Sequence, residues 1–251
     1  MQCAVEKFVE LKKSGLCLID MPTGTGKTTL TKDIIGRYLR GEILQDVKKI
    51  FYLTPQKKNI ADIYDRLATD FQDDPELFDG NVLRIFANDE CVISSFLSVE
   101  NQIQDVIKKK KSFVELRKAV SNYTQDSQIP QDVLSILAKE IKDKLEPSFR
   151  HDLADVFRKL ARTKKERLTL LNGEYSWVKA VYPACLTNER KVLFMTMAKF
   201  CAGNDPIIEK PYKFLAYLQT KEALVFIDEF DATKDVVLDQ QVQHRIQRLR
   251  P

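Results

Sequence analysis

Residue types that usually mark disulfide scaffolds and metal sites are scarce in this chain. Its 251 residues include five cysteines and two histidines, and no two cysteines form a CxxC pair. An odd number of scattered cysteines does not fit a complete disulfide framework. His151 and His244 each lack a nearby cysteine or carboxylate pair at metal-ligand spacing. We therefore expect mostly structural, reduced thiols.

Long apolar runs and a strong bias of charge are also missing. No apolar stretch approaches membrane-spanning length, and the first residues, MQCAVEKFVELKK, lack the apolar core of a signal peptide. Hydrophobic residues make up 44% and charged residues 30%, which is ordinary for a globular protein. The formal charge of +4 is too small to indicate nucleic-acid binding by itself. We expect a cytoplasmic or nuclear protein without a membrane partner.

The strongest pattern is the stretch from 16 to 30, LCLIDMPTGTGKTTL. An apolar run typical of a buried strand leads through a glycine-containing turn into helical spacing over 28–39. The glycines would let backbone N–H groups approach phosphate oxygens, and the positive end of the helix would face the same anion. Lys27 would reach the β- and γ-phosphates, and the Thr28 hydroxyl would bind Mg²⁺. The candidate nucleotide-binding residues are Thr23, Gly24, Thr25, Gly26, Lys27, Thr28 and Thr29.

A second pattern, ALVFIDEFD over 223–231, supplies two acids after an apolar strand. A parallel sheet would deliver Asp228 to its carboxyl edge, where ligands of such sheets bind. Asp228 would hold Mg²⁺, mostly through water, and Glu229 would orient or deprotonate an attacking water molecule. Two acids after a strand are common by chance, but together with the glycine turn they predict a joint site. Its catalytic candidates are Lys27, Asp228 and Glu229, and its metal ligands are Thr28 and Asp228.

Both patterns carry a resemblance to a known family. PTGTGKT departs from G-x-x-x-x-G-K-[ST] at its first position, which is Met21, and DEFD has Phe230 in its third place. These variants resemble motifs I and II of superfamily 2 helicases and translocases, the DEAD/DEAH-box class. The resemblance covers about 1–90 and 190–235. It implies a RecA-like domain that binds ATP and Mg²⁺ and acts on DNA or RNA.

The resemblance also implies further contacts. Gln2 lies upstream of motif I, where a glutamine of the family reads the adenine edge; a solvent-exposed glutamine is the alternative. The T-P-x-K sequence after the strand at 50–54 resembles motif Ia, which contacts a bound strand, and a helix start flanked by lysines suits phosphate. A plain loop with solvated lysines is the other interpretation. The candidate nucleic-acid contacts are Thr54, Pro55, Lys57, Thr196 and Lys199.

The pattern of strands predicts an α/β fold, a RecA-like P-loop NTPase domain with a mainly parallel sheet. Strands are expected near 16–20, 50–54, 82–86, 192–196 and 224–228. The interval from 87 to 191 is far longer than a βα connection requires and has helical spacing. One helix should span 103–120, a second should begin at Asp132 and stop at Pro147, and a third should follow at 153–161. We expect a helical insertion at 94–172 within a frame formed by 1–93 and 173–251.

These features predict the ATP-binding half of a helicase or translocase. After Asp231 we find no S-A-T motif III and no room for a second RecA-like domain with its arginine finger. We therefore expect a fragment of a longer motor that hydrolyses ATP slowly on its own. A P-loop kinase, a nucleotide-gated switch and a non-catalytic interaction module remain alternatives. The residues do not distinguish DNA from RNA.

Overall fold

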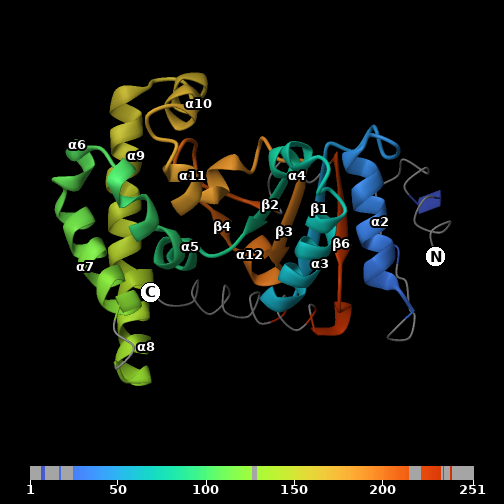
Figure 1. Cartoon of the computed structure of the whole chain (residues 1–251), viewed down its shortest axis with the longest axis horizontal. Helices are drawn as coiled ribbons and strands as arrows, with labels where there is room; N and C mark the ends of the chain where they lie inside the picture. Colours follow the sequence, from blue (N-terminus) through green and yellow to red (C-terminus); the bar gives the residue numbers. More distant parts are fainter. Residues whose placement is uncertain are drawn as a thin grey trace. The chain divides into compact units, whose positions relative to one another are not determined.

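The computed structural model describes residues 7–8, 17, 25–125, 129–214, 222–232, 234 and 238. The chain forms two compact units, coloured along the sequence in Figure 1. The first unit comprises Met1–Val82, Arg190–Ala198 and Tyr217–Pro251, and the second comprises Leu83–Glu189 and Lys199–Ala216. The expected strand at 16–20 lies, apart from Cys17, outside the described residues.

A four-stranded sheet has the order β2-β3-β1-β6. Its strands are β1 (Lys49–Thr54), β2 (Val82–Ile85), β3 (Val192–Thr196) and β6 (Ala223–Ile227). The central strand β1 pairs in parallel with both β3 and β6, and all six of its residues are buried. The continuous apolar run of β1 is typical of a strand that is buried on both faces of a sheet, as it is here. The prediction of an α/β fold with a mainly parallel sheet is therefore confirmed, whereas the RecA-like identity of the fold stays a prediction.

Three described helices belong to the first unit, and one of them, α3, packs on the sheet. They are α2 (Lys27–Leu39), α3 (Lys57–Thr69) and α4 (Pro75–Asn81). Helix α3 packs on β1 and β3 and buries Ile60, Ile63 and Leu67, and α2 packs on α3 and α4. In Figure 1, α2 and α3 run opposite to β1 and β6. The N-termini of both helices therefore face the edge at which these two strands end.

The second unit is mainly helical. Its described elements are α5 (Asn88–Ser95), η1 (Leu97–Gln102), α6 (Asp105–Lys108), α7 (Lys111–Gln125), α8 (Gln131–Glu140), η2 (Ile141–Leu145), α9 (Glu146–Leu160), α10 (Lys164–Asn172), α11 (Val178–Val181), η3 (Pro183–Leu186), β4 (Gly203–Asn204) and β5 (Tyr212–Lys213). The helix α12 (Met197–Cys201) follows β3 directly. Strands β4 and β5 form a separate antiparallel pair, which was not expected from the sequence. No helix in the described ranges is long and apolar enough to cross a membrane.

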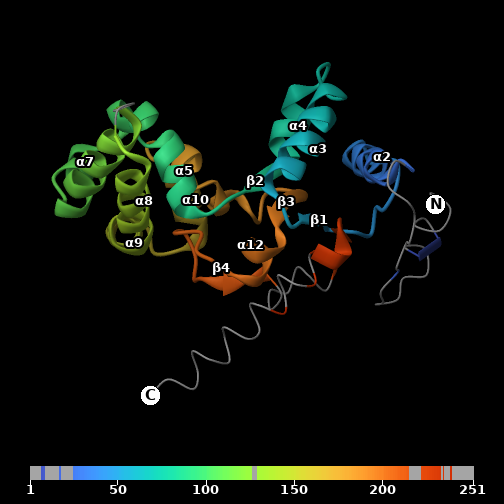
Figure 2. The ribbon, with the colours of Figure 1, turned by 90° about the horizontal axis from the view of Figure 1, so that it is seen from below.

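The second unit extends beyond the helices expected at 94–172. An aromatic cluster of Phe96, Phe113 and Phe149 joins the segment after α5 to α7 and α9. Helix α5 also packs on α11, and Figure 2 shows α7, α8 and α9 lying together. Because these buried contacts join 88–95 and 178–181 to the helices between them, the compact unit includes segments on both sides of that interval.

The helix predicted to stop at Pro147 continues through it. Helix α8, the π-helical segment η2 and α9 form one helical run from Gln131 to Leu160, with right-handed helical backbone at both junctions. The prediction of a stop was wrong because Pro147 lies in the first turn of α9, directly after the wider π-helical turn. Proline lacks an N–H to donate, and both prolines and π-helical turns alter the regular α-helical hydrogen-bond pattern, so the two irregularities lie side by side in one run. The helix predicted over 103–120 is instead divided between α6 and α7.

Candidate functional site

The start of α2 has the geometry of an anion-binding helix terminus. Gly26 is the N-cap residue with φ 83° and ψ 21°, in the left-handed region. An added Cβ would meet no atom within 4 Å, so backbone conformation rather than space requires glycine. The Gly26 carbonyl accepts the Leu30 N–H at 2.9 Å, and the first turn, which contains Lys27 and Thr28, has no acidic side chain. An uncapped terminus without acids favours an anionic ligand.

The structure places the predicted phosphate-binding residues as follows. Lys27 and Thr28 are half-buried, and Thr25 and Thr29 are exposed. Gln2, Thr23 and Gly24 lie outside the described residues.

The ends of three neighbouring strands place polar side chains along the carboxyl edge of the sheet. Thr54 ends β1 and is in register with Thr196, which ends β3. On the other side, Leu53 is in register with Ile227, and the Asp228 N–H donates to the Leu53 carbonyl at 2.8 Å. The sheet thus brings Thr196, Thr54 and Asp228 into one row, as the parallel arrangement predicts.

Both carboxylate oxygens of Asp228 accept a hydrogen bond. Oδ2 accepts from the Tyr52 hydroxyl at 2.7 Å, and Oδ1 accepts from the Glu229 N–H at 3.0 Å. Tyr52 is 1% exposed, and burial, followed by the hydrogen bond to Asp228, raises its pKa far above its usual value near 10. The phenol therefore stays protonated and donates at neutral pH. An ionised carboxylate has about four acceptor positions on its two oxygens, and carboxylate oxygens are ligands that suit Mg²⁺.

Glu229 has an unusual backbone conformation. Its φ of 51° is left-handed, which is rare for a bulky residue other than glycine. The residue is exposed, and its Oε1 accepts a hydrogen bond from Nδ2 of Asn59 at 3.1 Å. The same Asn59 nitrogen lies 3.3 Å from the Thr54 hydroxyl oxygen. Asn59 lies in the first turn of α3, so this helix start meets the end of β6.

Sequence reasoning missed both Tyr52 and Asn59. Tyr52 was interpreted only as a β-forming residue of a buried strand, although a buried tyrosine hydroxyl usually finds a partner. Asn59 was interpreted only as part of the polar segment before a helix. The available signal was weak, because both partners lie far away in the sequence and their proximity depends on strand order.

The predicted nucleic-acid contacts of the first unit differ in exposure. Thr54 is fully buried, with its hydroxyl toward Asn59, whereas Pro55 and Thr196 are half-buried and Lys57 is exposed. Lys57 is the first residue of α3, and no acidic residue lies in the first turn of that helix. Lys57 is therefore exposed at the start of α3, whereas Thr54 is buried at the end of β1.

Lys199 belongs to the second unit. Its Nζ donates to the Gly203 carbonyl at 3.4 Å. Burial lowers the pKa of its ammonium group, while the nearby Cys91 thiol and the Glu146 carboxylate act to raise it. Lys199 is half-buried, next to the buried Cys91 and Glu146 of its own unit.

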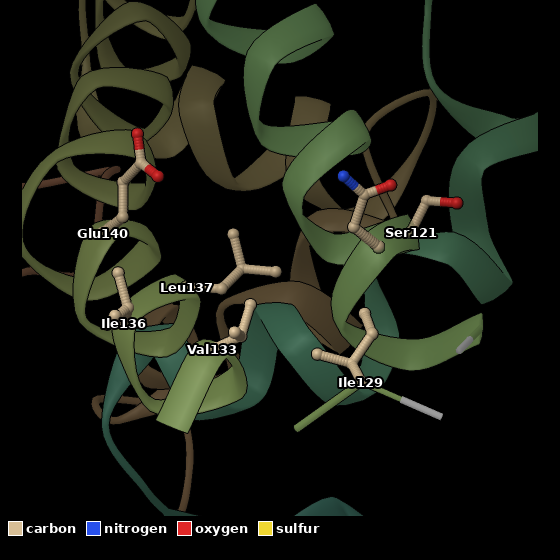
Figure 3. A pocket seen from close by; sticks show the side chains of 7 residues that line it. Ser121, Ile129, Val133, Ile136, Leu137 and Glu140 are labelled. Carbon is tan, nitrogen blue, oxygen red and sulfur yellow. The ribbon is translucent and has the colours of Figure 1, made fainter. Parts of the chain in front are cut away.

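A hollow in the second unit lies between α7 and α8 (Figure 3). Its volume is about 710 Å³, and its lining is mainly apolar, from Ile129, Val133, Ile136 and Leu137 together with Ser121, Asn122 and Glu140. One carboxylate, one amide and one hydroxyl do not provide the paired groups that acid–base or nucleophilic chemistry needs.

Within the described ranges, no cluster of three or more His, Cys, Asp and Glu side chains could hold a metal ion. The hard oxygen ligands assigned to Mg²⁺, the Thr28 hydroxyl and the Asp228 carboxylate, would need water and phosphate oxygens to complete an octahedral shell. No family model matches the chain, and no curated protein matches it.

Proposed function

We propose that this chain contains the ATP-binding, RecA-like domain of a nucleic-acid-dependent ATPase of the helicase or translocase type. The observation that most supports it is the edge of the parallel sheet. The uncapped start of α2, with Gly26 and Lys27, faces the edge at which β6 delivers Asp228 and Glu229 (Figure 1). Phosphate-binding and acidic residues are the two halves of a nucleotide site, and neither functions without the other.

In this proposal the triphosphate lies at the N-terminus of α2. Lys27 would neutralise the β- and γ-phosphates, and Thr28 and Asp228 would hold Mg²⁺, which would offset the negative charge of the phosphates. Glu229 orients a water molecule and accepts its proton as the water oxygen bonds to the γ-phosphorus. The bond from that phosphorus to the bridging oxygen breaks, and ADP leaves with the electron pair.

The start of α3 supports a nucleic-acid partner. Lys57 and Lys58 are exposed in its first turn, which contains no acidic residue, and no side chain caps the helix. An uncapped, basic helix start would bind the phosphates of a DNA or RNA strand.

The proposed motor has a second RecA-like domain in a longer protein of the cytoplasm or nucleus. An arginine supplied across the cleft between two such domains raises the hydrolysis rate by roughly 10³ to 10⁵ in related NTPases. This chain by itself should therefore bind Mg-ATP and hydrolyse it slowly.

Nucleotide binding is tested with the Lys27→Ala variant. We expect its affinity for Mg-ATP, measured by isothermal titration calorimetry, to fall at least about tenfold, since one lost charged contact is worth roughly 1.5 to 3 kcal/mol. Lys32→Ala is the matched control on the same helix, because the Lys32 Nζ pairs with Asp70 at 2.6 Å. Unchanged affinity in Lys27→Ala would remove Lys27 from the site.

Strand binding is tested by fluorescence anisotropy of labelled single-stranded DNA and RNA. Binding is measured with and without a non-hydrolysable Mg-ATP analogue at two salt concentrations. Salt-sensitive binding that changes with nucleotide supports the motor, and Lys57→Ala should weaken it. Lys48→Ala, at the opposite end of β1, is the control. Nucleotide binding without strand binding would favour a P-loop kinase or a nucleotide-gated switch.

A further inference from the structure

One side chain connects the end of the central strand to Glu229. The Nδ2 atom of Asn59 lies 3.3 Å from the Thr54 hydroxyl oxygen and 3.1 Å from Oε1 of Glu229. An ionised carboxylate only accepts hydrogen bonds, so the amide must turn its nitrogen toward Glu229. Nδ2 of Asn59 has two N–H groups, and the Thr54 hydroxyl oxygen and Oε1 of Glu229 can each accept one of them. The orientation of the Asn59 amide is therefore determined by its partners.

The base of this arrangement is rigid. Thr54 is fully buried at the end of β1, the strand with a neighbour on each side. The residue after Asn59, Ile60, is also fully buried, and α3 packs on β1 and β3. A half-buried amide held between a buried strand end and a buried helix turn loses little further conformational freedom when it binds a second partner.

Glu229, in contrast, is exposed and would otherwise sample several rotamers. The bond from the Glu229 backbone N–H to Oδ1 of Asp228, at 3.0 Å, restrains the backbone, and the bond from Asn59 to Oε1 restricts the side chain. The second carboxylate oxygen, Oε2, keeps its acceptor capacity toward a water molecule. The hydrogen bond from Asn59 to Oε1 thus fixes the direction of the Glu229 carboxylate. It leaves Oε2 to accept a hydrogen bond from the attacking water.

We propose that Asn59 is a positioning residue for ATP hydrolysis, which holds the Glu229 carboxylate in the direction from which it acts on the attacking water. The proposal rests on the proposed function, because it assigns a role in the same reaction. Asn59 does not touch the reacting atoms and acts through Glu229. A misplacement of about 1 Å in such a group costs up to about a hundredfold in rate.

The test compares steady-state hydrolysis of Mg-ATP by the wild-type chain and by Asn59→Ala. We expect kcat to fall by roughly 10- to 100-fold while the affinity for Mg-ATP stays within about threefold. Asn59→Asp keeps the size but replaces the donor with a negative charge facing Glu229, so its kcat should fall at least as far. Asp62→Ala, an exposed residue of the same helix, is the control and should match wild type.

A double-mutant cycle separates positioning from a general structural role. In the Glu229→Gln background, Asn59→Ala should produce little further loss, because the group that it positions is already inactive. A merely structural role would lower kcat by the same factor in both backgrounds and would lower the melting temperature. Equal factors would overturn the proposal.

The outcomes distinguish this proposal from the proposed function. If wild type hydrolyses ATP and Asn59→Ala hydrolyses it equally well, Asn59 has no positioning role and the proposed function stands. If wild type binds no Mg-ATP, both fail. If wild type binds Mg-ATP without measurable turnover, the affinity for ADP with aluminium fluoride replaces kcat. Asn59→Ala should then weaken that affinity relative to ADP, and an unchanged ratio would contradict the proposal.

Discussion

The Tyr52 hydroxyl and the Asp228 carboxylate are joined by a 2.7 Å hydrogen bond between residues 176 positions apart in the sequence. Tyr52 lies on β1 in register with Phe226 of the neighbouring parallel strand β6, and its long side chain reaches toward the edge where β6 ends. The acid assigned to Mg²⁺ is therefore oriented by a buried donor from another segment. This relationship leads to the first prediction.

Tyr52→Phe should remove the donor and leave the ring packing, including the contact with Phe194 at a centroid distance of 5.4 Å, in place. Because a hydrogen bond to a charged group is worth roughly 1.5 to 3 kcal/mol and Asp228 is half-buried, we expect a loss of about 1 to 2 kcal/mol in the free energy of unfolding. Urea unfolding measures this loss. The variant should also need more Mg²⁺ to bind ATP. Unchanged values for both would show that the bond contributes nothing.

Stability should decline in alkaline solution because tyrosines are buried in their neutral form. Burial raises the pKa of Tyr38 to about 12 and that of Tyr52 further, whereas both ionise near 10 when unfolded. Their contribution is complete below pH 10 and is lost as the pH rises above it, since only the unfolded state releases the protons. Each should lower the free energy of unfolding by about 1.4 kcal/mol per pH unit in that window.

Urea titrations from pH 8 to 11 measure this slope. Tyr38→Phe should make the decline shallower, and the loss of its 3.0 Å bond to the Val47 carbonyl should appear as a pH-independent offset. An unchanged slope in the variant would contradict the assignment.

Two glycine-to-alanine substitutions should change the free energy of unfolding in opposite directions. Gly26→Ala places a side chain at φ 83°, so we expect a loss of about 1 to 2 kcal/mol and weaker Mg-ATP binding. Gly80→Ala lies in α4, where an added Cβ meets nothing within 4 Å, and should raise stability by about 0.5 to 1 kcal/mol. Thermal melting of both variants decides this. Stabilisation by Gly26→Ala would mean that the turn does not need the left-handed conformation.

An alanine variant is usually more stable than a glycine variant at the same position, but at Glu229 we expect the glycine variant to be the more stable. Alanine would keep the strain of φ 51°, which costs about 1 to 2 kcal/mol, and glycine would relieve it. Both substitutions remove the contact with Asn59 equally, so their difference isolates the backbone strain. We expect Glu229→Gly to unfold at higher urea than Glu229→Ala. The opposite order would mean that the segment relaxes once the side chain is removed.

The regular elements were largely predictable, because their patterns are local. The strands expected at 50–54, 82–86, 192–196 and 224–228 match the described strands within a residue at each end, and the helix expected from 28 begins at Lys27. Each was recognisable from apolar runs and periodicity within a short window. The continuation of α8 and α9 through Pro147 was not, because a proline usually ends a helix and no local pattern announces a π-helical turn.

By itself, the sequence determined the acids after β6, the Gly26-Lys27-Thr28 turn and the strands that carry them. Only the tertiary structure decided which side chains hold Asp228 and Glu229. Their partners, Tyr52 and Asn59, lie 176 and 170 positions away in the sequence. Those pairs depend on β1 lying beside β6 in parallel register, and strand order is a product of packing over the whole sheet. The supporting residues of the site therefore became visible only in the fold.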